Sequence, residues 1–282
     1  MAELHRYADL LSAGLTREQV RQRLDAGAFD RLSRGVYGVG ADARHHLAAL
    51  IRRLPADTVL GHSTGAWLHG FGDPHDIVHV IVPAGVVVPR IKGVVVHQAV
   101  LPVRAPVRIA GLPCAPAARC AVDLTRALRR MDALPVLDLC LRAGACRPEE
   151  LLAEVALHGG LRGVCQARQL VRLADPRSEC RQESQLRLLL IDGGLPAPEP
   201  QVWVRDRNGI PLYRLDLGYR ERLIGIEYDG RTHLARDRLR SDRARMNWLA
   251  ANGWRMRYFT DLDLYRRPDH ILTTLKPLFL RS

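Results

Sequence analysis

Acidic residues at Asp216, Glu227 and Asp229 interrupt two short segments that otherwise have the composition of buried β-strands. Carboxylates are costly to bury unless a partner binds them. If a turn over residues 220–222 joins the two strands, Asp216 lies opposite or diagonal to Glu227, where like charges repel. A divalent cation that binds both carboxylates relieves this repulsion. Because carboxylate oxygens without thiolates suit Mg²⁺ or Mn²⁺, we expect Asp216 and Glu227 to be metal ligands.

Such a metal site predicts a particular reaction. A cation held by two carboxylates can bind a phosphate group and lower the pKa of a bound water molecule. That water molecule can then attack phosphorus in line with the leaving oxygen. The acids therefore predict the hydrolysis of phosphodiester bonds.

Residues 176–282 contain the elements that must position these acids. Leucines at helical spacing predict an amphipathic helix that ends at Gly193-Gly194. Three strands follow, and the Asn208-Gly209 pair predicts a hairpin turn between the first two. A long basic helix, a strand ("WRMRYFT") and a closing helix complete the order α-β-β-β-α-β-α.

This ordered set resembles a known nuclease core. The pattern Asp-x10-Glu-x-Asp lies across the predicted hairpin, after the helix that carries Glu183. Together with the run "IEYDGRTH…DRARMNWLAANGWRMRYFT", it resembles the PD-(D/E)xK nucleases. More narrowly, it resembles the Vsr-like endonuclease domains related to very-short-patch repair enzymes. The resemblance implies a restriction-endonuclease-like fold, with Asp216 and Glu227 as metal ligands and Glu183 as the accessory acidic residue.

One position departs from the general PD-(D/E)xK pattern. Asp229 stands where those nucleases carry a lysine. The Vsr-like relatives also lack a lysine at this position. We therefore expect another residue to activate the attacking water. His233 is a candidate general base or phosphate partner. Arg243, in the basic helix, is a candidate for neutralising phosphate charge.

Residues 1–40 carry the pattern of a DNA-binding module. Helix patterns lie over "ELHRYADLLSAG" and "LTREQVRQRLDAG", and Thr16 with Gln19 predicts a capping box for the second. The run "FDRLSRGVYGVG" predicts a strand or small hairpin. Two short helices and a β-wing describe a winged helix-turn-helix. The arginines expected to contact DNA are Arg17, Arg21, Arg23, Arg31 and Arg34.

Residues 41–175 predict a central mixed α/β domain. The run "LLSAGLTREQVRQRLDAGAFDRLSRGVYGVG", followed by "LPADTVLGHSTGAWLHGFG", resembles the winged-helix and central domains of AbiEi-type abortive-infection antitoxins. The resemblance implies binding to promoter DNA and a protein partner in a defence or toxin–antitoxin locus. Antitoxins of that type carry no nuclease-like domain, so their biology does not transfer to the whole chain.

The central domain also contains motifs that point to other chemistry. The run "GHSTG" matches the G-x-S-x-G nucleophile elbow with Ser63 at its centre, but "TVL" before it is a poor strand. The spacing of its histidines favours structural or surface roles over metal binding. The six cysteines form no C-x-x-C pair, so we expect buried thiols rather than metal ligands. These cysteines are Cys114, Cys120, Cys140, Cys146, Cys165 and Cys180.

Composition supports a nucleic-acid partner. The 282 residues carry a formal net charge of +12 with a pI of about 10.1, which favours a polyanion such as DNA. The chain has no apolar run of about 18 residues and no signal-peptide pattern, so we expect a cytoplasmic protein without a membrane span. The prediction is a multi-domain α/β protein with Mg²⁺-dependent endonuclease activity on DNA. The alternatives are a transcriptional regulator or antitoxin-like protein with a non-catalytic nuclease fold, or an RNA- or protein-binding module of a defence locus.

Overall fold

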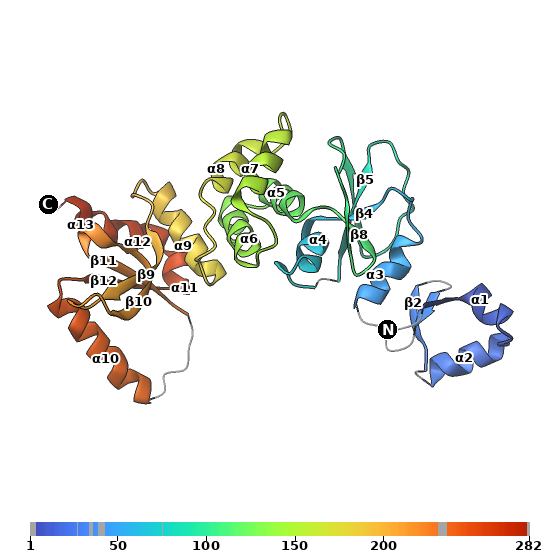
Figure 1. The fold of residues 1–282 in the computed structure, drawn as a ribbon, viewed down its shortest axis with the longest axis horizontal. Helices are drawn as coiled ribbons and strands as arrows, with labels where there is room; N and C mark the ends of the chain where they lie inside the picture. Colours follow the sequence, from blue (N-terminus) through green and yellow to red (C-terminus); the bar gives the residue numbers. More distant parts are fainter. Residues whose placement is uncertain are drawn as a thin grey trace. The chain divides into compact units, whose positions relative to one another are not determined.

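The computed structural model describes residues 4–26, 28–33, 36–38, 43–74, 76–230 and 236–280. The chain divides into two compact units, Met1–Asp123 and Leu124–Ser282. Each unit mixes helices and strands, so the protein is of the mixed α/β class (Figure 1). The divisions predicted after residues 40 and 175 remain predictions.

The first unit begins with two short helices and a small antiparallel sheet in the strand order β1-β3-β2. The side chains of Leu10, Val20 and Tyr37 form its buried centre. Thr16 accepts a hydrogen bond from the Gln19 N–H at 3.2 Å, and the Gln19 side chain accepts one from the Thr16 N–H at 2.9 Å, which confirms the predicted capping box. The elements are β1 (Leu4–Arg6), α1 (Tyr7–Ser12), α2 (Arg17–Asp25), β2 (Asp30–Ser33) and β3 (Val36–Gly38).

The start of the chain differs from the predicted helix. Residues 4–6 form β1, and only residues 7–12 are helical. The backbone of His5 pairs with Tyr37 of β3, so β1 is the third strand beside the hairpin. This pairing partner lies about thirty residues away in sequence, and local helical periodicity carries no information about it.

The rest of the first unit is built on a five-stranded sheet in the order β6-β5-β4-β8-β7. Helices α3 and α4 pack against it, with Leu47, Leu60 and Val80 buried between them. The first part of α5 also belongs to this unit. The elements are α3 (Ala43–Ile51), β4 (Val59–Leu60), α4 (His62–Leu68), β5 (Val78–Pro83), β6 (Val94–Ala99), β7 (Val107–Ile109), β8 (Leu112–Cys114) and α5 (Ala117–Ala127).

The second unit starts with a group of helices. They are α6 (Arg130–Arg142), α7 (Pro148–Leu157), α8 (Val164–Val171) and α9 (Arg181–Asp192). Leu134, Leu137, Leu151 and Leu170 are fully buried side chains of this group. Across the described residues of both units, no helix is both long and apolar enough to cross a membrane.

A four-stranded sheet in the order β12-β11-β10-β9 forms the rest of the second unit. Its strands and helices are β9 (Glu199–Arg205), β10 (Pro211–Tyr219), β11 (Ile224–Asp229), α10 (Arg236–Ala251), β12 (Arg255–Thr260), α11 (Asp261–Arg266), α12 (Pro268–Leu275) and α13 (Pro277–Leu280). Strands β11 and β12 are parallel, and the other neighbours are antiparallel. Leucines of α9 and α12 pack with Ile224 and Ile226 in one core, and Leu249 of α10 packs with Leu215 in another. The sheet therefore lies between α10 and the other helices (Figure 1).

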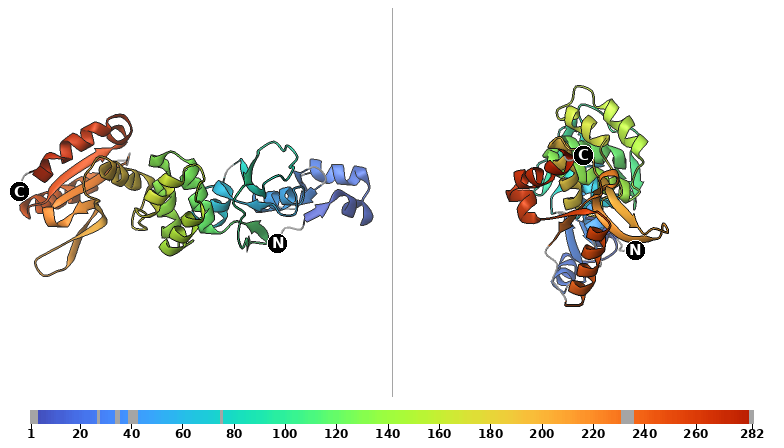
Figure 2. Two further views of the ribbon diagram at one scale, coloured as in Figure 1. Left: turned by 90° about the horizontal axis from the view of Figure 1, so that it is seen from above. Right: turned by 90° about the vertical axis from the view of Figure 1, so that its left-hand side faces the viewer.

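The two turns of the β9–β11 meander differ in build. Residues 206–210 join β9 to β10 in a loop that projects from the sheet (Figure 2). A single 3₁₀ turn, Arg220–Arg222, joins β10 to β11, and Leu223 follows in the left-handed region with φ of 50°. The observed order agrees with the α-β-β-β-α-β-α pattern expected from the sequence, with the short helix α11 in addition and with the closing helix divided into α12 and α13.

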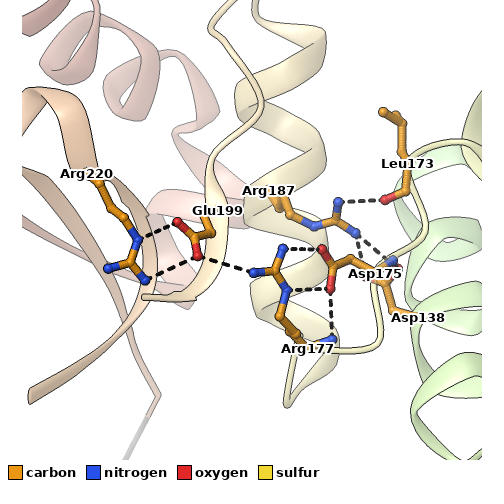
Figure 3. Close-up of polar contacts among 7 residues, drawn as sticks. All are labelled: Asp138, Leu173, Asp175, Arg177, Arg187, Glu199 and Arg220. Carbon is orange, nitrogen blue, oxygen red and sulfur yellow. Dashed lines mark hydrogen bonds and ion pairs between the residues drawn. The ribbon is translucent and has the colours of Figure 1, made fainter. Parts of the chain in front are cut away.

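Arginine side chains join α6, α9 and the sheet through acidic partners (Figure 3). Arg187 of α9 donates from Nη2 to both carboxylate oxygens of Asp138, at 2.8 and 3.0 Å, and both side chains are buried. Arg177 donates to Asp175 at 2.8 Å and to Glu199 at 3.3 Å. These contacts fix the start of α9 and of β9, which carry residues of the candidate site.

Candidate functional site

Asp216 and Glu227 come together at the β10–β11 hairpin. Leu217 pairs with Ile226 in the antiparallel register, so Asp216 and Glu227 stand at the next position of the two strands. The turn lies at residues 220–222, the position for which the sequence analysis expects the two acids opposite or diagonal to each other. Asp216 Oδ2 accepts a hydrogen bond from the Tyr228 N–H at 2.8 Å. The hairpin thus holds two carboxylates next to each other on a fixed backbone.

The two carboxylates are electrostatically strained. Burial raises the pKa of Glu227 to about 8, and the negative charge of Asp216 adds to the effect. Burial also raises the pKa of Asp216 to about 6, against the hydrogen bond from Tyr228 and together with the charge of Glu183. Both carboxylates therefore favour a proton or a cation near neutral pH more than ordinary acids do.

Glu183 reaches the same region from the first turn of α9. Its side chain is buried, with 7 % of its surface exposed. Glu183 Oε2 accepts hydrogen bonds from the Glu179 N–H at 2.8 Å and from Gln201 Nε2 at 2.9 Å. These donors hold the carboxylate in place near Asp216. The structure therefore brings together three predicted site residues from α9, β10 and β11.

Arg245 of α10 is a member of the site that the sequence did not reveal. Its guanidinium forms an ion pair with Glu227, and Nη2 donates to the Arg214 carbonyl at 2.9 Å. The guanidinium also lies over the Tyr213 ring, 5.9 Å from its centre. The Nε atom is buried and has no hydrogen-bond partner among the described residues. Arg245 thus offsets part of the charge of Glu227 and Asp216, and its Nε donor has no acceptor among the described residues.

The remaining predicted catalytic residues are Asp229, whose charge adds to the raised pKa of Glu227, together with Arg243 and His233. Arg243 is exposed, and it lies two positions before Arg245. Residues two apart on a helix point to different faces, so Arg243 does not share the direction of Arg245. Asp229 is exposed at the end of β11. His233 lies outside the described residues.

The donor set fits a hard divalent cation held by two ligands. Asp216 and Glu227 offer carboxylate oxygens, and a dication would offset the burial and the neighbouring negative charge that raise their pKa values. With Glu183 included, the three acids do not bring three oxygen atoms within 4.8 Å of one another in the described part of the chain. In this geometry Glu183 fits an outer position rather than that of a third direct ligand.

A second candidate surface is the arginine face of α2. Arg17, Arg21 and Arg23 are all exposed. Arg21 lies 3.9 Å from Asp25, and Arg23 lies over the Phe29 ring at 5.7 Å from its centre. The backbone of Arg31 belongs to β2, and Arg34 lies outside the described residues. The helix thus presents several positive charges to solvent close to the β2–β3 hairpin.

The strand–turn–helix at the run "GHSTG" has a geometry different from that of a nucleophile elbow. An elbow places its serine at the sharp, strained turn. Here the strained residue is His62, with φ of 47°, and Ser63 follows inside α4. His62 stacks on His97 with 3.6 Å between ring centres, and His97 Nε2 lies 2.9 Å from His79 Nδ1. Burial and the charge of His97 lower the pKa of His62 to about 4.

The cysteines are mostly buried, as the sequence predicted: Cys114, Cys120, Cys140 and Cys146 are buried, and Cys165 is exposed. Two pairs form within the fold. Cys140 Sγ lies 3.4 Å from Cys146 Sγ. Cys114 and Cys120 gather with His69, and hydrogen bonds from Cys120 and His69 lower the pKa of the Cys114 thiol to about 6 despite burial.

Comparisons with known proteins match most of the chain. Residues 56–173 match the family model of the AbiEi antitoxin C-terminal domain. Two curated relatives are the "Uncharacterized protein MT2308" and the "Uncharacterized protein Rv2248", from two strains of Mycobacterium tuberculosis. Each is 32% identical over 260 residues, which is 91% of this chain and 94% of the relative. A crystal structure of the Rv2827c protein from Mycobacterium tuberculosis is similar with a TM-score of 0.43 and 19% identity, over 64% of this chain and 75% of that one.

These matches support the AbiEi resemblance and do not bear on the nuclease resemblance of residues 176–282. The two curated relatives extend through nearly the whole length of the chain, beyond the region of the family model. The chain therefore belongs to the family of the mycobacterial proteins MT2308 and Rv2248, and its residues 56–173 are similar to the AbiEi antitoxin C-terminal domain.

Proposed function

We propose that this protein is a DNA-binding regulator of the AbiEi antitoxin type, which acts at a toxin–antitoxin locus and has a toxin as its protein partner. The match of residues 56–173 to the AbiEi antitoxin C-terminal domain carries this proposal. The helix pair α1–α2 and the β2–β3 hairpin support it, because they agree with a winged helix-turn-helix. In this arrangement α2 enters the major groove.

The arginines of α2 supply the binding energy in this model. Arg17, Arg21 and Arg23 are exposed and can approach phosphates or guanine edges. Each phosphate contact releases condensed counterions, so affinity falls as salt rises. The net charge of +12 strengthens the approach to any duplex, and the arginines on α2 select the site.

Fluorescence anisotropy with the promoter duplex of the protein's own locus tests this proposal. A variant with Arg17, Arg21 and Arg23 changed to alanine should bind more weakly, and its logarithmic salt slope should fall by about 0.9 for each lost phosphate contact. The matched control changes Arg162, Arg168 and Arg172, three exposed arginines of the second unit, to alanine. Equal affinity and equal slope for wild type and the α2 variant would exclude α2 as the DNA-binding helix.

A second function is favoured by the acids of the second unit. Asp216 and Glu227 are half-buried carboxylates with raised pKa values, faced by a single arginine. We propose that they hold Mg²⁺ or Mn²⁺ and that this site hydrolyses phosphodiester bonds in DNA. When bound, the cation would polarise the phosphate and lower the pKa of a water molecule.

The protein's own residues have distinct roles in this second function. The negative charge of Glu183, on α9, raises the affinity of Asp216 for a cation. The two hydrogen-bond donors of Glu183 hold its carboxylate in this position. Arg245 orients Glu227 and can turn its unused Nε–H toward a phosphate oxygen, which supplies the charge that Asp229 cannot. His233 remains the proposed general base, and Arg243 a proposed phosphate contact.

Cleavage of supercoiled plasmid with Mg²⁺, Mn²⁺ or chelator tests the second function. Glu227→Gln and Asp216→Asn should each lower the rate by on the order of 10³-fold, because they remove a metal ligand. The matched control is Glu199→Gln, an acid of β9 that is paired with arginines. Cleavage by folded Glu227→Gln protein at the wild-type rate would rule out the assignment. In that case the first proposal stands alone.

A further inference from the structure

Three potential ligands of a soft metal meet in the first unit, outside both proposed sites. His69 follows α4, Cys114 ends β8, and Cys120 lies in the first turns of α5. One ligand atom from each lies within 4.8 Å of the others. This is the one such trio in the described residues, and it joins His69 to two cysteines that lie more than forty residues further along the chain, on consecutive elements.

A glycine in α4 leaves room for the two sulfur atoms of the trio. Both cysteines are fully buried, and His69 is half-buried. Gly65 of α4 faces them: a Cβ atom at this position would lie 2.4 Å from Cys120 Sγ and 3.4 Å from Cys114 Sγ. Any other residue at position 65 would clash with Cys120 Sγ. Helix α4 can therefore approach the thiols only because this position is glycine.

A backbone carbonyl fixes the imidazole. His69 Nε2 lies 2.8 Å from the Ala115 carbonyl oxygen, and Cys120 Sγ lies 3.5 Å from the same oxygen. Metal-binding histidines commonly donate one ring N–H to a carbonyl or carboxylate, which sets the orientation of the ring. The Ala115 carbonyl is placed to serve as such a partner.

The second cysteine pair provides an internal comparison. Cys140 and Cys146 are also buried, and their sulfur atoms are 3.4 Å apart. In the described part of the chain, no third metal-binding side chain completes a trio with them. Two features therefore distinguish Cys114 and Cys120 from an ordinary buried pair: a neighbouring histidine, His69, and the room that Gly65 leaves opposite the thiols.

We propose that His69, Cys114 and Cys120 form a binding site for a thiophilic divalent cation of the zinc type. In a tetrahedral zinc site two sulfur ligands lie about 3.8 Å apart, so the trio needs inward movements of about 1 Å or less to close around the ion. Two thiols lose their protons on binding, and the two thiolates neutralise the dication. A water molecule or another external ligand takes the fourth position, on the side of the half-buried His69. The bound ion would tie α4, β8 and α5 together.

Cobalt titration of the purified full-length protein tests this site. Co²⁺ added to chelator-treated protein should give thiolate-to-metal charge-transfer bands and the intense visible bands of tetrahedral coordination, saturating at one ion per chain. Zn²⁺ should displace it. Cys114→Ser, Cys120→Ser and His69→Gln should each weaken binding by at least about 100-fold, more than the loss of an outer partner costs.

The controls are Cys140→Ser and Cys146→Ser, which should keep the wild-type spectrum. His69→Gln leaves both buried thiols in place, so it remains informative if a serine variant fails to fold. A Zn²⁺-induced rise in melting temperature should occur for the wild type and the Cys140→Ser variant and be absent for His69→Gln. The same cobalt spectrum in His69→Gln as in wild type, or loss of the spectrum in Cys140→Ser, would overturn the assignment.

Discussion

Helix α9 lies beside two sets of acidic residues that differ in how far arginines neutralise them. Three acids beside it have arginine partners: Asp138 binds Arg187, and Asp175 and Glu199 share Arg177 (Figure 3). One turn before Arg187, Glu183 belongs to an acidic cluster with Asp216 and Glu227, in which Arg245 is the one arginine that forms an ion pair among the described side chains. The same helix thus supports a neutralised network and an acidic cluster.

The pKa values express this difference for Asp175 and Glu199, whereas burial raises the pKa of the third paired acid, Asp138, in spite of the charge of Arg187. A hydrogen bond from Arg220 lowers the pKa of Glu199. Burial acts to raise the pKa of Asp175, but the hydrogen bonds from Arg177 outweigh it and the pKa falls. In the acidic cluster, burial and neighbouring charge raise the pKa values of Asp216 and Glu227 instead. Among the described side chains, Asp216 and Glu227 thus keep raised pKa values beside Arg245, in contrast to Asp175 and Glu199.

The largest effect on this comparison should come from breaking the buried pair. Arg187→Met leaves the Asp138 carboxylate buried, with the Asp175 N–H at 2.8 Å as its backbone donor. Loss of one partner of a buried ion pair costs about 3–5 kcal/mol, so the free energy of unfolding in urea should fall by that amount. The double variant Arg187→Met/Asp138→Leu should recover much of the loss. A loss below about 1 kcal/mol in the single variant would show that the network is not structural.

An effect of opposite sign is expected in the acidic cluster. The pKa of Asp216 rises from 3.8 to about 6, so the folded protein holds a proton that the unfolded chain releases between these pH values. The contribution of this proton to the free energy of unfolding is present below pH 4 and is lost as pH rises through about 6. Asp216→Asn should therefore match the wild type near pH 4 and exceed its free energy of unfolding by on the order of 2 kcal/mol above pH 7.

Urea unfolding from pH 4 to 8 without divalent cations measures this difference. Adding Mg²⁺ should reduce it, because the cation stabilises the wild-type acids and not the variant. A variant that is less stable than wild type at pH 8 would show that Asp216 contributes to the fold in the same way as the paired acids.

The smallest effect should come from Glu199→Gln. Its ion pairs with Arg177 and Arg220 are partly exposed, so the variant should lose no more than about 1 kcal/mol at pH 7. Because the pKa of Glu199 is lowered, its stability is present above its ordinary value of 4.5 and fades as the pH falls below it. The pH trend of the unfolding free energy is thus opposite to that of Asp216→Asn. Identical trends in the two variants would remove the distinction between the two sets of acids.

The sequence predicted those contacts that depend on nearby residues. A turn over residues 220–222 predicted that Asp216 lies opposite or diagonal to Glu227, and the observed register places the two residues directly opposite. The capping box of Thr16 and Gln19 likewise predicted the start of α2. In both cases the partners are joined by one turn of chain, so geometry follows from residue order.

Contacts made by packing between distant elements were not predictable in this way. Arg245 reaches Glu227 only because Trp248 and Leu249 set the rotation of α10 against the sheet. Helical spacing alone could not choose between it and Arg243. The trio that includes His69 was missed for a related reason: motif spacing detects ligands on one loop or helix, whereas these come from α4, β8 and α5.

The short turn between β10 and β11 has a consequence for the evolution of the family. Residues 220–223 are the only connection between the strands that carry Asp216 and Glu227, and a one-residue slip in register turns a strand's side chains to the opposite face. An insertion there would separate the two carboxylates without unfolding the sheet. The loop at residues 206–210 has no such restriction. Among relatives that keep both acids, insertions and deletions should therefore accumulate in the loop at 206–210 and be absent between Asp216 and Glu227.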